Sequence, residues 1–177
     1  ASAIYRSSMP CVLFYAADQD PSTTSSLGIL NYSRRLIQEF ARQPDPGFTL
    51  VLLVAEGHRQ LFVPDGLPAW ITVDELPGPP RGTGLRRLWC DHVGVLRSAR
   101  RQGARLIHFP KGWVPLRKPP GLRFLATIHD AIPEYCAVHH PGGTSRLKRA
   151  YFAWALRHSL NKADLIVTDS DASRDHL

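Results

Sequence analysis

Short apolar runs alternate with amphipathic stretches along the whole chain, and this alternation limits the possible folds more than any other feature. The apolar runs predict buried strands at or near residues 11–17, 48–55, 70–73, 106–109, 123–128 and 164–168. Apolar residues recur at helical spacing between these runs, which predicts helices over 29–40, 85–99 and 147–158 and another from Ser170 onward. Strands and helices that alternate through short connections are typical of a doubly wound, mostly parallel α/β sheet.

Length, charge and cysteine content set further limits. The 177 residues suffice for one ordinary domain or two small ones, and the net charge of +7 favours anionic partners. The three cysteines lie far apart, which fits neither a disulfide framework nor a zinc site. No apolar run has the length of a membrane span and no secretory leader is recognisable. We therefore expect a cytoplasmic protein, with peripheral contact to the inner face of the membrane as an open alternative.

Candidate functional residues lie where predicted strands end, because ligands of such sheets bind beyond the carboxyl ends of the strands. Gly28 falls between the first strand and first helix, where backbone amides can approach a phosphate. His108 and His129-Asp130 directly end two later strands, and an imidazole there suits polar or proton-transfer chemistry. A plain turn at Gly28 and structural hydrogen bonding by the histidines are the alternatives.

Several enzyme classes lose support because their motifs are missing. The chain contains no G-x-G-x-x-G fingerprint, no P-loop and no G-x-S-x-G elbow. The His, Glu and Cys residues between His129 and His140 match no zinc template, so we expect no metal. No recognised nucleic-acid-binding motif is present, so we expect no nucleic-acid partner.

Arginines are frequent in two of the predicted helices and at the start of the strand that follows the first of these helices. They are Arg86, Arg87, Arg97, Arg100, Arg101 and Arg105, and then Arg146, Arg149 and Arg157. Solvated helix faces explain such a distribution, and so does contact with anionic lipid or with a phosphate-bearing acceptor. The second interpretation leaves open a non-enzymatic domain that binds anionic surfaces through its arginine-rich helices.

Four segments together resemble one enzyme family. Residues 27–36, LGILNYSRRL, are similar to a glycine-rich loop and first helix, and residues 104–110, ARLIHFP, to a strand with a terminal H-x-P. Residues 127–130, TIHD, match a T-[IV]-H-D motif, and residues 162–175 resemble the last strand and helix start of the same pattern. The chain thus resembles the N-terminal half of the retaining glycosyltransferases of family 4, which have the two-domain GT-B architecture.

The resemblance implies a Rossmann-like domain over residues 1–177 that mainly holds the acceptor. A C-terminal domain for the nucleotide-sugar donor would follow it and is absent from this chain, so the isolated chain is expected to be inactive. The whole enzyme would transfer a sugar, with retention, to a hydroxyl of a glycan, a lipid-linked sugar or a natural product. Neither a metal nor another cofactor is implied, and the leaving diphosphate would be stabilised electrostatically.

The resemblance also assigns roles to individual residues. His129 would contact the donor sugar near the reacting centre, and Asp130 would hold its loop and the histidine. Gly28, with Leu27, would face the donor diphosphate, although Leu27 and Leu30 replace glycines that are usual in this loop and reduce its freedom. The acceptor-side candidates are Asn31, Tyr32, His108 and Trp113.

Overall fold

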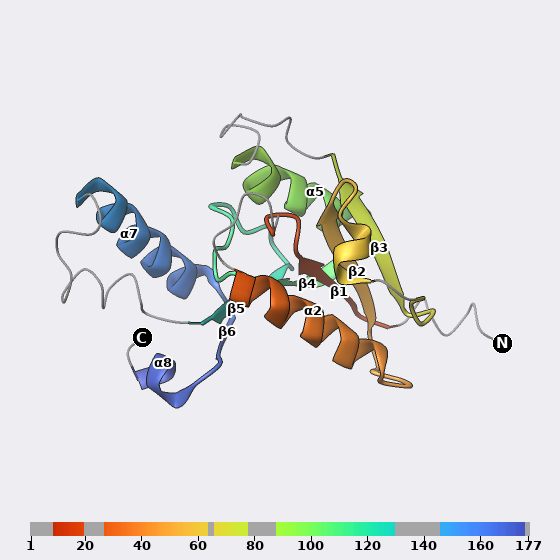
Figure 1. Cartoon of the computed structure of the whole chain (residues 1–177). Helices are drawn as coiled ribbons and strands as arrows, with labels where there is room; N and C mark the ends of the chain where they lie inside the picture. Colours follow the sequence, from red (N-terminus) through yellow and green to blue (C-terminus); the bar gives the residue numbers. More distant parts are fainter. Residues whose placement is uncertain (1–8, 20–26, 64–65, 78–87, 130–145, 176–177) are drawn as a thin grey trace.

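The computed structural model describes residues 9–19, 27–63, 66–77, 88–129 and 146–175. Its strands form one sheet of six in the order β3-β2-β1-β4-β5-β6, and all of their pairings are parallel (Figure 1). The strands are β1 (Cys11–Tyr15), β2 (Thr49–Ala55), β3 (Ile71–Leu76), β4 (Ala104–Phe109), β5 (Arg123–Ile128) and β6 (Leu165–Thr168). The predicted doubly wound, Rossmann-like sheet is therefore confirmed. Its strand order reverses direction between β1 and β4, which is where such sheets bind ligands.

Helices cover both faces of the sheet. They are α2 (Leu27–Ala41), α3 (Arg59–Phe62), a π-helical turn η1 (Cys90–Gly94) that continues into α5 (Val95–Arg101), α7 (Arg146–Lys162) and α8 (Asp171–Asp175). The Ser173 amide donates to Ser170 Oγ at 3.1 Å, so Ser170 caps α8 as predicted. The third strand extends to Leu76, beyond the predicted 70–73.

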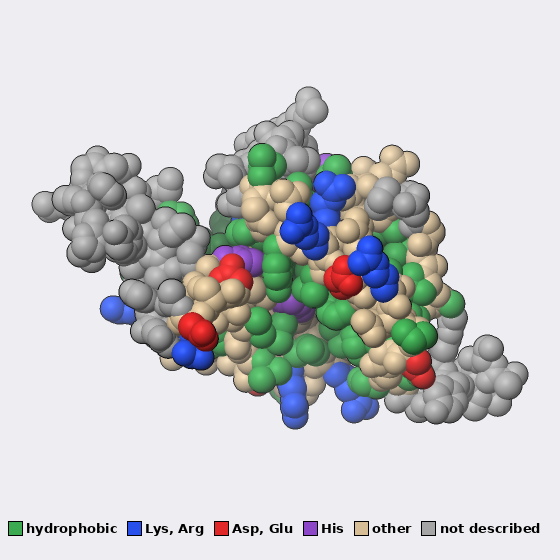
Figure 2. Space-filling model, turned by 60° about the horizontal axis from the view of Figure 1, so that its bottom comes forward, with side chains coloured by type: hydrophobic (Ala, Val, Ile, Leu, Met, Phe, Trp, Pro, Cys, Tyr) green, Lys and Arg blue, Asp and Glu red, His purple; other side chains and the backbone are tan. Residues whose placement is uncertain are grey.

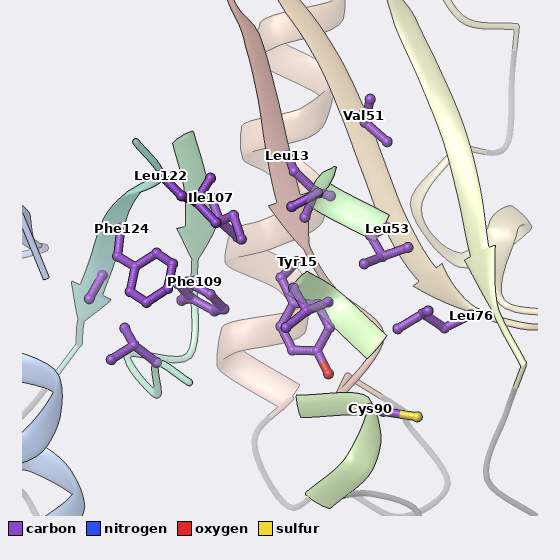
Figure 3. Packing of buried hydrophobic residues seen from close by; sticks show 14 of the residues in the cluster. Leu13, Tyr15, Val51, Leu53, Leu76, Cys90, Ile107, Phe109, Leu122 and Phe124 are labelled. Carbon is purple, nitrogen blue, oxygen red and sulfur yellow. The ribbon is translucent and has the colours of Figure 1, made fainter. Parts of the chain in front are cut away.

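Alternate residues of each strand face opposite sides of the sheet. Leu13 and Tyr15 of β1 belong to a core cluster with residues of η1, α5 and α7, which cover what we call the α7 face (Figure 3). Phe14 between them belongs to a second cluster with residues of α2 and α3, which cover the α2 face. Buried apolar residues on both faces explain why these strands are continuous hydrophobic runs in the sequence.

Two aspartates tie neighbouring elements together. Asp74 of β3 accepts hydrogen bonds from Ser98, Arg101 and Gln102 at the end of α5, and these bonds outweigh its burial and lower its pKa. Asp164 accepts from the Phe124 amide at 2.7 Å and pairs with Lys118, which holds the start of β6 against β5.

The edge of the sheet at β6 and the N-terminal part of α7 are only partly buried. Leu165, Ile166 and Val167 of β6 are 41–53% exposed. Helical spacing places Tyr151, Trp154 and Ala155 of α7 on one apolar side, but Tyr151 and Trp154 are 57% and 51% exposed whereas Ala155 is buried. The apolar side is exposed there because this end of α7 extends past the edge of the sheet, as Figure 1 shows.

Candidate functional site

His129 lies at the carboxyl end of β5, as the sequence predicted. Its Nε2 lies 2.8 Å from the carbonyl oxygen of Pro110, and its Nδ1 lies 3.1 Å from Asp169 Oδ2. A histidine donates to two acceptors at once only when both ring nitrogens carry protons. The Ser173 hydroxyl also donates to the backbone oxygen of His129 at 2.9 Å, so β5 and α8 meet at this residue.

Three further polar side chains form a chain of contacts beside His129 on the α2 face. His108 Nε2 of β4 lies 2.7 Å from Thr127 Oγ1 of β5, and the Tyr32 hydroxyl of α2 lies 3.5 Å from the same oxygen. The Tyr32 ring meets the His129 ring edge-on, with centroids 4.7 Å apart. We call His108, Thr127, Tyr32 and His129 the histidine cluster.

His108 is a buried, neutral member of this cluster. Burial, together with the charge of nearby His129, lowers its pKa from 6.5 to about 4. The ring also packs edge-on against Phe14, with centroids 4.8 Å apart. His108 therefore holds Thr127 rather than exchanging protons at neutral pH.

The start of α2 lies next to the histidine cluster. Gly28 is exposed, and a Cβ placed on it would meet nothing within 4 Å, so its backbone is open to a ligand. Gly28 precedes Tyr32 by four residues, so the two share one side of the helix, one turn apart. Leu27, which is 55% exposed, shares the adjacent solvent-facing side with Asn31.

Trp113 lies on the opposite face of the sheet, in a pocket of about 370 Å³. The pocket opens at the carboxyl end of β1, between η1, α7 and the loop that follows β4. Its walls include Tyr15, Asp18, Asp91, Trp113, Phe152 and Trp154. The structure thus separates Trp113 from the other acceptor-side candidates, Tyr32 and His108, which belong to the histidine cluster.

The loop that carries Trp113 is fastened on both sides of the pocket. Lys111 Nζ lies 3.6 Å from Asp18 Oδ2, and the Val114 amide donates to Ser159 Oγ at 3.3 Å. The Leu116 amide donates to His92 Nδ1 at 3.3 Å. Gly112 turns the loop with φ +79, and a Cβ there would meet the Thr127 carbonyl oxygen at 3.1 Å.

The arginines do not form a single surface among the described residues. Arg101 pairs with Asp74, and the guanidinium of Arg97 lies 5.6 Å from the ring centroid of Trp89. On the face shown in Figure 2, Lys and Arg side chains form separate small groups, while histidines lie among hydrophobic side chains. Asp130 and the side chains of Arg146 and Arg149 lie outside the described residues.

Two members of the site, Thr127 and Asp169, lie in segments that carry the family resemblance but received no role from the sequence. Thr127 precedes His129 by two residues and therefore lies on the same side of β5, which was a usable signal. Asp169 follows β6, the next strand of the sheet, and its carboxylate reaches His129 from a position 40 residues later in the chain. Within the described ranges, no three His, Cys, Asp or Glu side chains gather as metal ligands would, and no helix is long and apolar enough to cross a bilayer.

Comparison with models of protein families gives a match. The family model described as Glycosyltransferase Family 4 matches residues 28–177. This range starts at the exposed glycine of α2 and includes His108, Trp113 and His129. No curated protein sequence matches the chain significantly.

Proposed function

The chain belongs to glycosyltransferase family 4, and on this premise we propose that it is the acceptor-side domain of a retaining, GT-B type enzyme. Family membership implies a sugar donor and an acceptor. We propose that the donor is a nucleotide sugar and that the acceptor reacts through a hydroxyl group. The bond between the anomeric carbon and the diphosphate breaks, and a bond from that carbon to the acceptor oxygen forms.

The observation that best supports this proposal is the contact between α2 and the end of β5. Gly28 lies one helical turn before Tyr32, and the Tyr32 ring contacts His129. A diphosphate at the open backbone of Gly28 would be favoured by the first amides and the dipole of α2. The sugar attached to that diphosphate would then lie near His129.

His129 offers one of its two ring nitrogens to this sugar. The Nε2 of His129 is directed at the Pro110 carbonyl oxygen, and the His129 side chain is 15% exposed. Nδ1 faces Asp169, which is 44% exposed and therefore able to give way to a ligand hydroxyl. We assign His129 the role of orienting the donor sugar through Nδ1, while the carbonyl of Pro110 fixes the ring.

The remaining members of the histidine cluster position His129. Thr127 joins the buried ring of His108 to the hydroxyl of Tyr32, and Tyr32 supports the ring of His129. None of them needs a metal ion to hold its place, so the proposal includes no metal, and the leaving diphosphate is stabilised by the helix amides.

The test measures donor turnover by the longest natural form of the protein. Nucleotide release from a panel of nucleotide sugars is followed, with and without candidate acceptors, for wild type, His129→Ala and the control His58→Ala. His58 precedes the short helix α3 and does not belong to the histidine cluster. We expect His129→Ala to lower kcat by about 100-fold or more, the size of effect seen when a preorganised polar group is removed. His58→Ala should stay within about twofold of wild type, and EDTA should have no effect.

Other outcomes would contradict specific parts of the proposal. Full turnover in His129→Ala would remove the role of His129 but keep the enzyme class, and loss of activity in EDTA would show a metal requirement. If a folded, full-length protein neither binds nor turns over a donor, the domain is better described as one that binds anionic surfaces. Such binding would weaken steeply as salt is raised.

A further inference from the structure

The pocket on the α7 face differs in chemistry from the histidine cluster and from the surface as a whole. The chain carries a net charge of +7, yet none of the described residues that line the pocket is Lys or Arg. Two carboxylates, Asp18 and Asp91, lie in its wall. Its volume of about 370 Å³ is in the range of pockets that bind small molecules.

Aromatic rings form a continuous row along one side of this pocket. The ring centroids of Trp113 and Phe152 lie 5.9 Å apart at 31°, and those of Tyr151 and Trp154 lie 6.2 Å apart at 35°. Trp154 stacks on His158 at 5.5 Å and 17°. The side chains of Tyr151 and Trp154 are more than half exposed, so their surfaces are available to a ligand. Flat aromatic faces of this kind bind the apolar face of another ring.

The polar groups opposite this row are acceptors of hydrogen bonds. The Tyr15 hydroxyl donates to Asp91, and burial, with the negative charges of Asp91 and Asp18, raises the pKa of Tyr15 well above its usual value. Asp18 is paired with Lys111 at 3.6 Å, and Lys111 is not among the residues that line the pocket. The Nδ1 of His92 is itself an acceptor, of the Leu116 amide. A phosphate or carboxylate would therefore meet the negative charge of Asp91, whereas a hydroxyl would find carboxylate oxygens to donate to.

We propose that this pocket binds the acceptor as an uncharged, hydroxylated ring, stacked on the aromatic row and hydrogen-bonded through its hydroxyls toward Asp18 and Asp91. The proposal rests on the proposed function in that the ring is the acceptor of the transfer. It also makes the pocket selective, because a phosphate group on the same ring is disfavoured. Both a sugar ring and a phenolic aglycone have this chemistry.

Binding without any donor tests the proposal separately from turnover. Calorimetric titrations of the full-length protein use methyl hexosides, hydroquinone and hexose 6-phosphates as probes. We expect at least one of the two neutral classes to bind at least tenfold more tightly than the hexose phosphates. Binding by methyl hexosides alone identifies a sugar acceptor, and binding by hydroquinone alone identifies a phenolic one. Equal or tighter binding of the phosphates, or no binding of either neutral class, would overturn the proposal.

Matched variants localise the binding to the pocket. Trp154→Ala should weaken binding of the neutral ring about tenfold, while Trp89→Ala should change it less than twofold. Both tryptophans are partly exposed, at 51% and 38%, but Trp89 is not among the residues that line the pocket. Asp91→Asn should reduce the preference for the neutral ring over its phosphate at least threefold. A Trp154→Ala variant that binds like wild type, or an Asp91→Asn variant with unchanged preference, would contradict the assignment.

These results are interpretable whether or not the transferase test succeeds. Selective binding of a neutral ring by a protein that turns over no donor would support the pocket as a binding site and would contradict the transferase function. Turnover with a phosphate-bearing acceptor would sustain the transferase and refute the pocket assignment.

Discussion

The histidine cluster on the α2 face and the aromatic pocket on the α7 face are built from the same strand ends. The neighbouring residues His108 and Phe109 of β4 lie on different faces of the sheet. The neighbours Thr127 and Ile128 of β5 also lie on different faces. Because successive side chains of a strand point to opposite faces, one carboxyl edge supplies two chemically different regions. The histidine cluster consists of polar groups that contact one another, whereas the pocket presents exposed rings and hydrogen-bond acceptors to a ligand.

This difference suggests that the two faces of the sheet serve different functions. Side chains that contact each other keep a fixed geometry, which suits the orientation of a reacting sugar. Exposed rings of the pocket give up little internal contact when a ligand covers them, which suits recognition. The loop after β4 contributes to both regions, because Pro110 contacts His129 and Trp113 lines the pocket.

Gly112 joins the two regions, so its substitution should have the largest effect. It has φ +79, and a Cβ would meet Ile128 Cδ1 at 3.0 Å and the Thr127 carbonyl oxygen at 3.1 Å. Gly112→Ala should lower the free energy of unfolding by about 3 to 4 kcal/mol, from backbone strain and overpacking together.

The matched control for this substitution is Gly121→Ala. Gly121 has φ +77, but a Cβ there would meet nothing within 4 Å. The loss should therefore be only the backbone strain of about 1 to 2 kcal/mol. Urea denaturation of both variants measures the difference in their free energies of unfolding. Equal losses would show that the close approach of Gly112 to β5 adds nothing to the cost of the substitution.

Acid should destabilise the protein through the α2 face. The pKa of His108 is about 4 in the folded protein and 6.5 as its ordinary value. Above pH 6.5 this residue is neutral in both the folded and the unfolded chain, so its titration does not lower the free energy of unfolding. Between pH 6.5 and 4 the unfolded chain takes up a proton that the folded chain does not, so stability falls by up to about 3 kcal/mol.

The variant His108→Gln isolates this contribution. Its stability is lower at neutral pH because Thr127 loses its partner, but the decline between pH 6.5 and 4 that belongs to His108 disappears. Denaturation curves at several pH values, with wild type and variant compared at each, measure this slope. An unchanged slope would mean that another group causes the acid sensitivity.

Alkali should destabilise the protein through the α7 face. Burial and nearby carboxylates raise the pKa of Tyr15 well above 10, so the folded protein keeps this proton at a pH where the unfolded chain loses it. Stability is therefore complete below pH 10 and falls as the pH rises further. Tyr15→Phe should lose about 1 kcal/mol at neutral pH with its hydrogen bond to Asp91, and should decline less above pH 10. Parallel alkaline declines of variant and wild type would contradict this assignment.

The sequence predicted the strands and their alternation with helices because buried runs and helical periods are local properties. It also located His108 near the end of β4 and His129 directly after β5, since each lies at the end of an apolar run. The π-helical turn at Cys90–Gly94 was not predicted, because helical periodicity does not distinguish one inserted residue within a turn.

The pocket could not be predicted because no local pattern contains it. Its walls come from β1, η1, the loop after β4 and α7, so that Tyr15, Asp91, Trp113 and Trp154 meet only in the folded chain. Helical spacing placed Tyr151 and Trp154 on the apolar side of α7, but it carried no information on where the sheet ends. Likewise, Asp169 reaches His129 through the pairing of β5 with β6.

The exposed strand β6 has a consequence for work with the chain in solution. It is the last strand in the sheet order, and Leu165, Ile166 and Val167 are 41–53% exposed. An edge strand of this kind offers backbone donors and acceptors, with apolar side chains beside them, to a strand of another molecule. Concentrated preparations should therefore aggregate by edge-to-edge pairing, and a lysine in place of Ile166 should keep the molecules apart.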